Sequence, residues 1–190
     1  MAITINGSGS ITGITTRLAA AAAPAGSVIQ TVSSHKSDVF TTTSDTPVDI
    51  SGTDEAGSGT VWECNITPTA ADSKILVIVY LGMIGNATGG YSTELFLVRD
   101  STNIALGDAE GSSRPRVTLS ANDSTSWGHS AGNITFLDSP GTDSAITYKL
   151  QMSTQGGYGT GLLNRRGDDA SDNVSYQRSG SSITLLEIAV

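Results

Sequence analysis

The segment with the clearest chemical pattern is Gly128-His129-Ser130-Ala131-Gly132, which matches the G-x-S-x-G nucleophile elbow of α/β-hydrolases. In that elbow a strand, a tight turn and a helix expose the serine, and the acid and the histidine follow it in the chain. Here residues 133–137 are typical of a strand, and both histidines, His35 and His129, precede Ser130. We therefore expect no catalytic residues and no enzyme activity. A small serine esterase that uses Ser130 is the alternative.

Acidic residues near the C-terminal end of the sequence are the candidate metal ligands. Asp168, Asp169 and Asp172, with Asn173, offer oxygen atoms that suit calcium, but their spacing misses the EF-hand loop pattern. Cys64 is the single cysteine, so the chain has no intrachain disulfide and no thiolate zinc site. We expect a solvated acidic loop, no metal and no cofactor; a structural ion is the alternative.

Two further short segments resemble functional motifs. Arg166-Gly167-Asp168 spells an adhesion tripeptide, and residues 157–161 resemble a phosphate-binding loop. The phosphate loop requires a βαβ unit, which this sequence does not predict. We interpret both segments as hairpin tips.

Three aromatic residues lie in or beside Gly/Ser-rich segments: Tyr91, Trp127 and Tyr158. Because amphipathic rings at exposed positions bind glycans and protein surfaces, these are the candidate receptor-contact residues. The alternative is that each ring packs over its own loop. The remaining basic side chains of interest are interpreted as solvated surface: His35, Lys36, Arg114 and Arg116.

Behind these residues the sequence has a strand-like period. Residues 146–153 alternate apolar and polar side chains, as do residues 62–66, which predicts strands with one buried face. Residues 74–81 and 95–98 are continuous apolar runs, so both of their faces should be covered, one by the core and the other by a second sheet or a neighbouring subunit. The final run, residues 182–190, predicts a last strand.

Glycine-rich clusters separate these runs and predict turns: 51–53, 57–59, 89–90, 156–157, 167–169 and 179–180. Short strands at this spacing, with no helix between them, indicate about eight to ten strands in an all-β fold. We expect an antiparallel β-sandwich or jelly-roll.

Composition limits the function. The net charge is −8 and the chain has only 10 basic residues, which argues against a nucleic-acid partner. Charged residues are 15% of the chain against an average of about 25%, so the surface must be mainly Ser, Thr, Asn and Gly. The longest apolar run, residues 75–81, is far shorter than the roughly 20 residues of a membrane span, and we expect no membrane insertion.

The N-terminal residues differ from the rest. Residues 2–15 alternate apolar and polar side chains in two short pieces, residues 17–23 have helix propensity, and Pro24 and Gly26 end that segment. The first basic residue is Arg17, so the segment does not have the basic start of a secretory signal. We expect a short helix or linker before the β domain.

Several segments together resemble tail-fibre and other virion surface proteins of tailed bacteriophages, especially marine and cyanobacterial ones. The segments are Met1–Ile14, Pro24–Gln30, Ile66–Val77, Leu97–Ser101, Phe136–Pro140, Ile146–Leu150 and Ser182–Ile188. The resemblance implies an N-terminal virion-attachment arm at residues 1–26, followed by a β-sandwich head at residues 27–190 that commonly forms a homotrimer. The arm would attach through its apolar residues: Ile3, Ile5, Ile11 and Ile14.

The chain departs from long fibres because no shaft or heptad region separates Ala23 from Val28. The expected function is therefore a phage virion structural protein, a short trimeric tail fibre that mediates host attachment. The alternative is a capsid decoration or head-fibre protein that stabilises the capsid. In both cases the expected location is the virion, and the expected partners are further copies of the chain, other virion proteins and a host surface glycan or protein.

Overall fold

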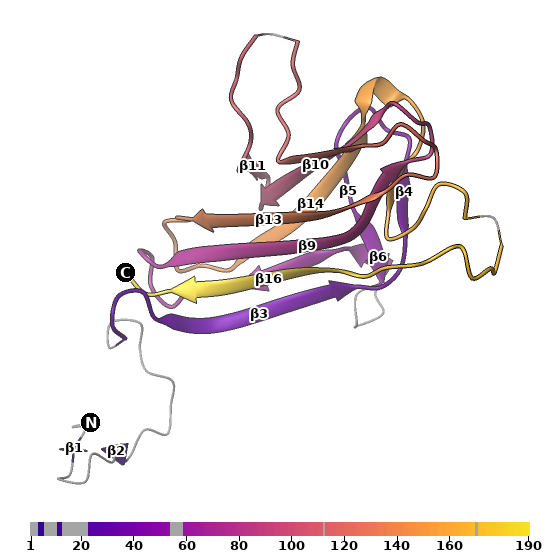
Figure 1. Cartoon of the computed structure of the whole chain (residues 1–190). Helices are drawn as coiled ribbons and strands as arrows, with labels where there is room; N and C mark the ends of the chain where they lie inside the picture. Colours follow the sequence, from indigo (N-terminus) through magenta and orange to yellow (C-terminus); the bar gives the residue numbers. More distant parts are fainter. Residues whose placement is uncertain (1–3, 6–10, 13–22, 54–58, 112, 170) are drawn as a thin grey trace.

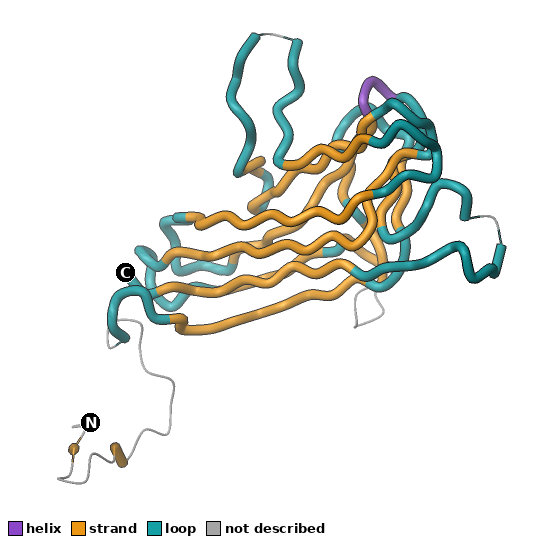
Figure 2. Tube along the Cα trace, in the orientation of Figure 1, coloured by secondary structure: helices purple, strands orange, loops and turns teal. Residues whose placement is uncertain are grey.

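The computed structural model describes residues 4–5, 11–12, 23–53, 59–111, 113–169 and 171–190, and strands dominate this part of the chain (Figure 1). Strands account for 49% of the residues and helix for 2%, which confirms the expected all-β fold. Figure 2 shows that η2 (Gln155–Gly157), the helical turn in the described part of the chain, lies at the end of a strand rather than against a sheet.

Two six-stranded antiparallel sheets form a sandwich. Sheet I has the spatial order β11 (Thr102–Ile104), β10 (Ser92–Arg99), β14 (Ile146–Thr154) and β5 (Val48–Asp49), with β12 (Leu119–Asn122) also paired to β10 and β8 (Glu63–Ile66) also paired to β14. Sheet II has the order β3 (Val28–Lys36), β16 (Ser181–Ile188), β9 (Lys74–Asn86), β15 (Gly161–Leu163) and β4 (Phe40–Thr42), with β13 (Ser130–Asp138) also paired to β9.

Two small ribbons complete the described strands. The strand β6 (Ser51–Thr53) pairs with β7 (Gly59–Val61), and β1 (Thr4–Ile5) pairs with β2 (Ile11–Thr12). The described residues therefore contain more strands than the eight to ten expected, because strands of two to four residues are too short to produce a visible period in the sequence.

The predicted alternation places the core between the sheets. Every second residue of β14, and the apolar residues of β8, point inward, while their polar neighbours face out. The inward residues of β9 face them from sheet II. The core residues of these three strands are Ile146, Tyr148, Leu150, Met152, Cys64, Ile66, Ile75, Val77, Val79, Leu81 and Ile84.

The two continuous apolar runs have different surroundings. In β10, Phe96 is 6% and Val98 is 2% exposed although both lie outside the core cluster, so both faces of this strand are buried as predicted. In β9, the outward residues Leu76 and Ile78 are only partly buried and Tyr80 is 49% exposed. The second face of β9 is therefore only half covered by its own chain.

The predicted turn at residues 51–53 is wrong, because this segment is the strand β6. A Cβ atom at Gly52 would overlap the Nζ atom of Lys36 and lie 2.7 Å from both carboxylate oxygens of Asp38. The buried side chain of Lys36 occupies the space beside residue 52. Glycine here therefore marks a close approach to a strand and not a turn.

The expectation of a solvated Lys36 is also wrong. Its side chain is 0% exposed, and Nζ lies 2.6 Å from Asp38 Oδ1 and donates to the Ser51 carbonyl oxygen at 2.8 Å. A buried ammonium group requires such partners. His35, Arg114 and Arg116 are exposed, as predicted.

The chain enters sheet II beside the last strand. The Gly26 amide donates to the Ala189 carbonyl oxygen at 2.8 Å, and the Ala189 amide donates to the Ser27 carbonyl oxygen at 2.9 Å. The division into an arm at residues 1–26 and a head at residues 27–190 stays a prediction, and the predicted helix or linker at residues 17–23 lies almost wholly outside the described residues.

Candidate binding surface at one end of the sandwich

Four connections meet at the end of the sandwich opposite the C-terminus (Figure 1), beside which Gly26 bonds to Ala189. The strand pairing brings them together, because Asn86 pairs with Gly161, Thr154 with Thr93, and Ser92 with Asn122. The connections are residues 87–91, 123–129, 155–160 and 164–180. We refer to them as the loop end.

The connections pack closely on one another. A Cβ atom at Gly89 would lie 2.5 Å from the Ser124 carbonyl oxygen, and a Cβ atom at Gly167 would overlap the Ser126 carbonyl oxygen. Only glycine permits such an approach between two backbones. The β12–β13 connection is therefore held between the β9–β10 connection and the β15–β16 connection.

The Asn86 side chain links two of these connections by hydrogen bonds. Its side chain is buried, and Nδ2 donates to the carbonyl oxygens of Tyr158 at 3.1 Å and Ser92 at 3.4 Å. Its Oδ1 accepts from the Thr88 amide at 2.9 Å. These bonds satisfy the buried side-chain amide of Asn86, and they fix the position of the Tyr158 backbone.

Asp123 organises the β12–β13 connection. Hydrogen bonds from the Thr125 amide at 3.0 Å and the Thr125 hydroxyl at 2.9 Å hold the pKa of the Asp123 carboxyl below its usual value. This arrangement is an Asx-type turn, which fixes a loop without a regular element.

The three aromatic residues selected from the sequence all lie at the loop end. The rings of Tyr91 and Tyr158 stack across two connections, with centroids 4.7 Å apart and planes at 17°. Tyr158 is 58% exposed and Trp127 is 55% exposed. The Tyr158 ring also lies beside Gly156 of its own connection, so the two tyrosines pack both on each other and on a loop. The role of all three aromatic residues in binding stays a prediction.

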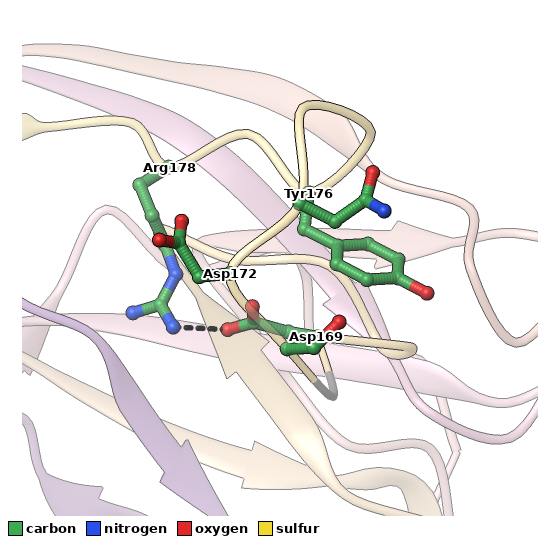
Figure 3. A pocket seen from close by; sticks show the side chains of 6 residues that line it. Asp169, Asp172, Tyr176 and Arg178 are labelled. Atoms are coloured by element: carbon green, nitrogen blue, oxygen red, sulfur yellow. Dashed lines mark ion pairs between the residues drawn. The ribbon is translucent and has the colours of Figure 1, made fainter.

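A pocket of about 450 Å³ opens in the β15–β16 connection (Figure 3). It is lined by Asp169, Ser171, Asp172, Asn173, Tyr176 and Arg178. Carboxylate, amide, hydroxyl and guanidinium groups converge on this small volume. Such a lining can exchange hydrogen bonds with a polyhydroxylated ligand.

The expectation of a solvated acidic loop is wrong for Asp169. Asp169 has a side chain only 7% exposed, and it forms ion pairs with Arg178, as Figure 3 shows, and with Arg165 Nε at 3.6 Å. Asp168 pairs with Arg166 at 3.0 Å. Arginine neutralises these carboxylates, so they are not available together as calcium ligands.

The adhesion tripeptide is likewise closed on itself. Arg166 Nη2 donates to Asp168 Oδ2 at 3.0 Å, Arg166 Nη1 donates to the Ser175 carbonyl oxygen at 2.7 Å, and the guanidinium lies 5.8 Å from the Tyr176 ring centroid. The segment lies in the long β15–β16 connection and is not the hairpin tip expected. Residues 157–161 are not a hairpin tip either, because they pass from sheet I to sheet II.

Ser130 is the first residue of β13, so a turn and a strand replace the turn and helix of a nucleophile elbow. His129 Nδ1 lies 3.4 Å from the Trp127 carbonyl oxygen. Among the residues that the structure describes, no group of three His, Cys, Asp or Glu side chains is arranged to hold a metal ion.

A second polar cluster lies at the opposite end, and sequence reasoning missed it. Arg99 Nη1 donates to both carboxylate oxygens of Asp138 at 2.9 Å, and the buried Tyr148 hydroxyl donates to Asp138 Oδ2 at 2.7 Å. Burial, followed by the Asp138 hydrogen bond, raises the pKa of Tyr148 far above its usual value. The cluster joins the two sheets at the Asp138 end of β13.

The predicted attachment residues are only partly within the described chain. Ile5 lies opposite Ile11 in the β1–β2 pair. Ile3 and Ile14 lie outside the described residues. Their role in attachment stays a prediction.

Comparison with known proteins gives no relative from which a role can be transferred. No protein-family model matches the chain, and no curated protein matches its sequence. In the described part of the chain, no helix combines the length and the apolar composition needed to cross a membrane.

Proposed function

We propose that the chain is a structural protein of a tailed-phage virion: a short trimeric tail fibre whose loop end contacts the host surface, with no catalytic role. The observation that carries this proposal is the placement of two features at opposite ends of one sandwich. The chain enters sheet II at Gly26, beside the C-terminus, and the loop end lies at the other end of the strands (Figure 1). The exposed rings of Tyr158 and Trp127 belong to the loop end. A head with these features at opposite ends can attach to the particle at one end and contact the host surface with the other.

The composition of the loop end supports a glycan as the host ligand. The stacked Tyr91 and Tyr158 rings offer an apolar face to the C–H side of a sugar, which is the usual role of an exposed aromatic side chain with a polar tip. The pocket beside Arg178 supplies donors and acceptors for sugar hydroxyl groups. The tight packing of the connections pre-organises these groups, which lowers the entropy lost on binding.

The N-terminal arm would attach the head to the particle. Deleting residues 2–16 should remove the protein from purified particles while the head keeps its circular dichroism spectrum and its oligomeric mass. Quantitative mass spectrometry of particles measures incorporation. If the truncated chain is incorporated as well as the full chain, the arm is not the attachment segment and this part of the proposal fails.

One observation favours the capsid decoration or head-fibre alternative. The first strand of the head begins at Val28, two residues after Gly26, so the described residues 23–28 leave no length for a shaft. The copy number per particle separates the two functions. A few copies at the tail support the fibre, and hundreds of copies over the head support the decoration protein.

A further inference from the structure

The outer face of sheet II carries a group of adjacent apolar side chains, whereas the outward side chains of β14 in sheet I are polar. On β14 of sheet I the outward residues are hydrogen bonded or charged: Lys149 Nζ pairs with Asp49 Oδ2 at 2.8 Å, and Gln151 Nε2 donates to Asp49 Oδ1 at 2.8 Å. Burial opposes ionisation of Asp49, but these two bonds outweigh it and hold the pKa of the carboxyl below its usual value. The outward side of β14 is therefore adapted to water, and on the neighbouring β10 the outward Phe96 and Val98 are buried by the same chain.

Sheet II presents a different set of outward side chains. The register places Leu137, Leu76 and Leu186 side by side on β13, β9 and β16. On the same face, Ile78 is the next outward residue of β9 after Leu76, and Ile188 is the next outward residue of β16 after Leu186. Figure 1 looks onto this face, and no described strand or helix crosses in front of it.

Leu76, Ile78, Leu186 and Ile188 are partly buried in the single chain, and the apolar residues around them are exposed. Val28 is 54% exposed, and Tyr80 and Leu137 are each 49% exposed. The solvent face of an antiparallel sheet is normally polar, and a contiguous apolar patch indicates a binding surface. We name this surface, formed by the outward residues of β3, β16, β9 and β13, the sheet II face.

We propose that the sheet II face binds further copies of this chain. Its outward residues include no carboxylate, although the chain as a whole has a net charge of −8. Two copies that approach through an acidic surface repel each other, whereas the sheet II face brings together apolar and neutral polar side chains and the Lys74 ammonium group. A second copy is also a partner whose surface matches in strand spacing and side-chain height.

The size of the face suits self-association. Four strands of about eight residues cover roughly 19 Å by 26 Å, or about 500 Å² per copy. Two copies would then bury about 1,000 Å², which reaches the lower limit for a specific interface.

The inference rests on the proposed function only for the number of copies, which is three. If three sheets, each about 19 Å wide, form the sides of a triangular prism, each sheet lies about 5.5 Å from the threefold axis. This distance is close to half the usual spacing of two packed sheets, which is about 5 Å. Leu76, Ile78 and Leu186, near the middle of the face, would then meet at the axis. The Gly26 entry and the loop end would project from opposite ends of the assembly.

The test uses the full chain and outward substitutions that leave the core intact. Leu186→Arg places a charge within the leucine row, and Thr184→Arg places one beside it without removing an apolar side chain. Ser120→Arg, at an exposed position of β12 in sheet I, is the matched control. Circular dichroism and thermal unfolding establish that each variant is folded.

Sedimentation equilibrium should give wild type and Ser120→Arg a mass three times that of the 19.4 kDa chain. Both sheet II face variants should dissociate, with dissociation constants raised at least about 100-fold, because an unpaired charge would be buried. A wild-type chain that is monomeric, or folded face variants that keep the oligomeric mass, would overturn the inference. A wild-type dimer sensitive to both substitutions would keep the face and refute the trimer of the proposed function.

A labelling experiment locates the contact independently of mass. Cys64 is buried and burial raises its pKa to about 11, so a new exposed thiol reacts first. In Leu137→Cys, maleimide labelling should be slow in the oligomer and fast when Thr184→Arg is added. Fast labelling of an oligomer without Thr184→Arg would show that another surface forms the contact.

Discussion

At the scale of single residues, the space beside Gly52 shows how a buried charge constrains its neighbour. The Lys36 ammonium, bonded to Asp38 and the Ser51 carbonyl oxygen, occupies space that a Cβ atom at residue 52 would need. Lys36 cannot withdraw toward water without leaving these partners. A side chain at position 52 must therefore displace an ion pair.

We predict that Gly52→Ala lowers the free energy of unfolding by about 1–3 kcal/mol, the usual cost of overpacking. Gly107→Ala is the matched control, because the nearest atom to its added Cβ, the Val117 carbonyl oxygen, is 3.9 Å away. Urea denaturation measures both. Equal stability of the two variants would show that Lys36 relocates without cost.

Glu187 is the second residue whose environment has a measurable consequence. It is 0% exposed; Oε1 accepts from the Thr69 amide and hydroxyl, each at 2.7 Å, and Oε2 accepts from Gln30 Nε2 at 2.6 Å. Burial acts to raise the pKa of Glu187, but hydrogen bonds from Thr69, Ser73 and Gln30 outweigh it and lower the pKa below 4.5.

A carboxyl group with a lowered folded-state pKa stabilises the fold above its unfolded pKa, and this contribution is lost as the pH falls through the folded value. Glu187→Gln should therefore be less stable than wild type at pH 7, by about 1–3 kcal/mol, because one donor loses its acceptor. The difference should shrink below pH 4.5. Urea denaturation at pH 7 and at pH 3 measures it, and a difference independent of pH would contradict the assignment.

At the scale of elements, the loop end combines a stacked ring pair with a buried support. The Asn86 side chain holds the backbone of Tyr158, and the Tyr158 ring stacks on Tyr91. The ring and its support can therefore be tested separately. The ring is exposed and the support is buried, so they should affect different measurements.

We predict that Tyr158→Ala reduces adsorption of particles to host cells by about tenfold, the effect of losing about 1.4 kcal/mol. Tyr158→Phe keeps the stacked ring and should adsorb nearly as wild type, and both should keep the wild-type melting temperature. Asn86→Ala should lower the melting temperature as well as adsorption. Unchanged adsorption in Tyr158→Ala would exclude the tyrosine pair from the receptor site.

At the scale of the whole molecule, a net charge of −8 and an apolar sheet II face have opposite effects on assembly. Charge repulsion between copies is screened by salt, since the Debye length falls from about 10 Å at 0.1 M to about 3 Å at 1 M. Apolar contacts are not weakened in this way. Self-association through the sheet II face should therefore strengthen with salt.

We predict that the dissociation constant of the oligomer falls when sodium chloride is raised from 0.05 M to 0.5 M. Sedimentation velocity over a dilution series measures the change, with Ser120→Arg as a control that reduces the net negative charge outside the face. A constant that rises with salt would indicate an interface held by ion pairs.

The sequence by itself determined the all-β class, a strand at residues 146–153 and the burial of every second residue in it, because a two-residue period is a local property of the chain. It also located Tyr91, Trp127 and Tyr158 in connections between strands. Local patterns of this kind do not depend on which strands become neighbours.

Only the tertiary structure decided which of these features meet. Lys36 is buried because β6 brings the Ser51 carbonyl oxygen to it, and Asp169 is neutralised because Arg165 and Arg178 approach it from both sides. Tyr91 and Tyr158 are 67 positions apart in sequence and stack because β10 and β14 are neighbours. The solvation of a charged side chain depends on partners that the fold supplies from distant parts of the chain, and no local period encodes them.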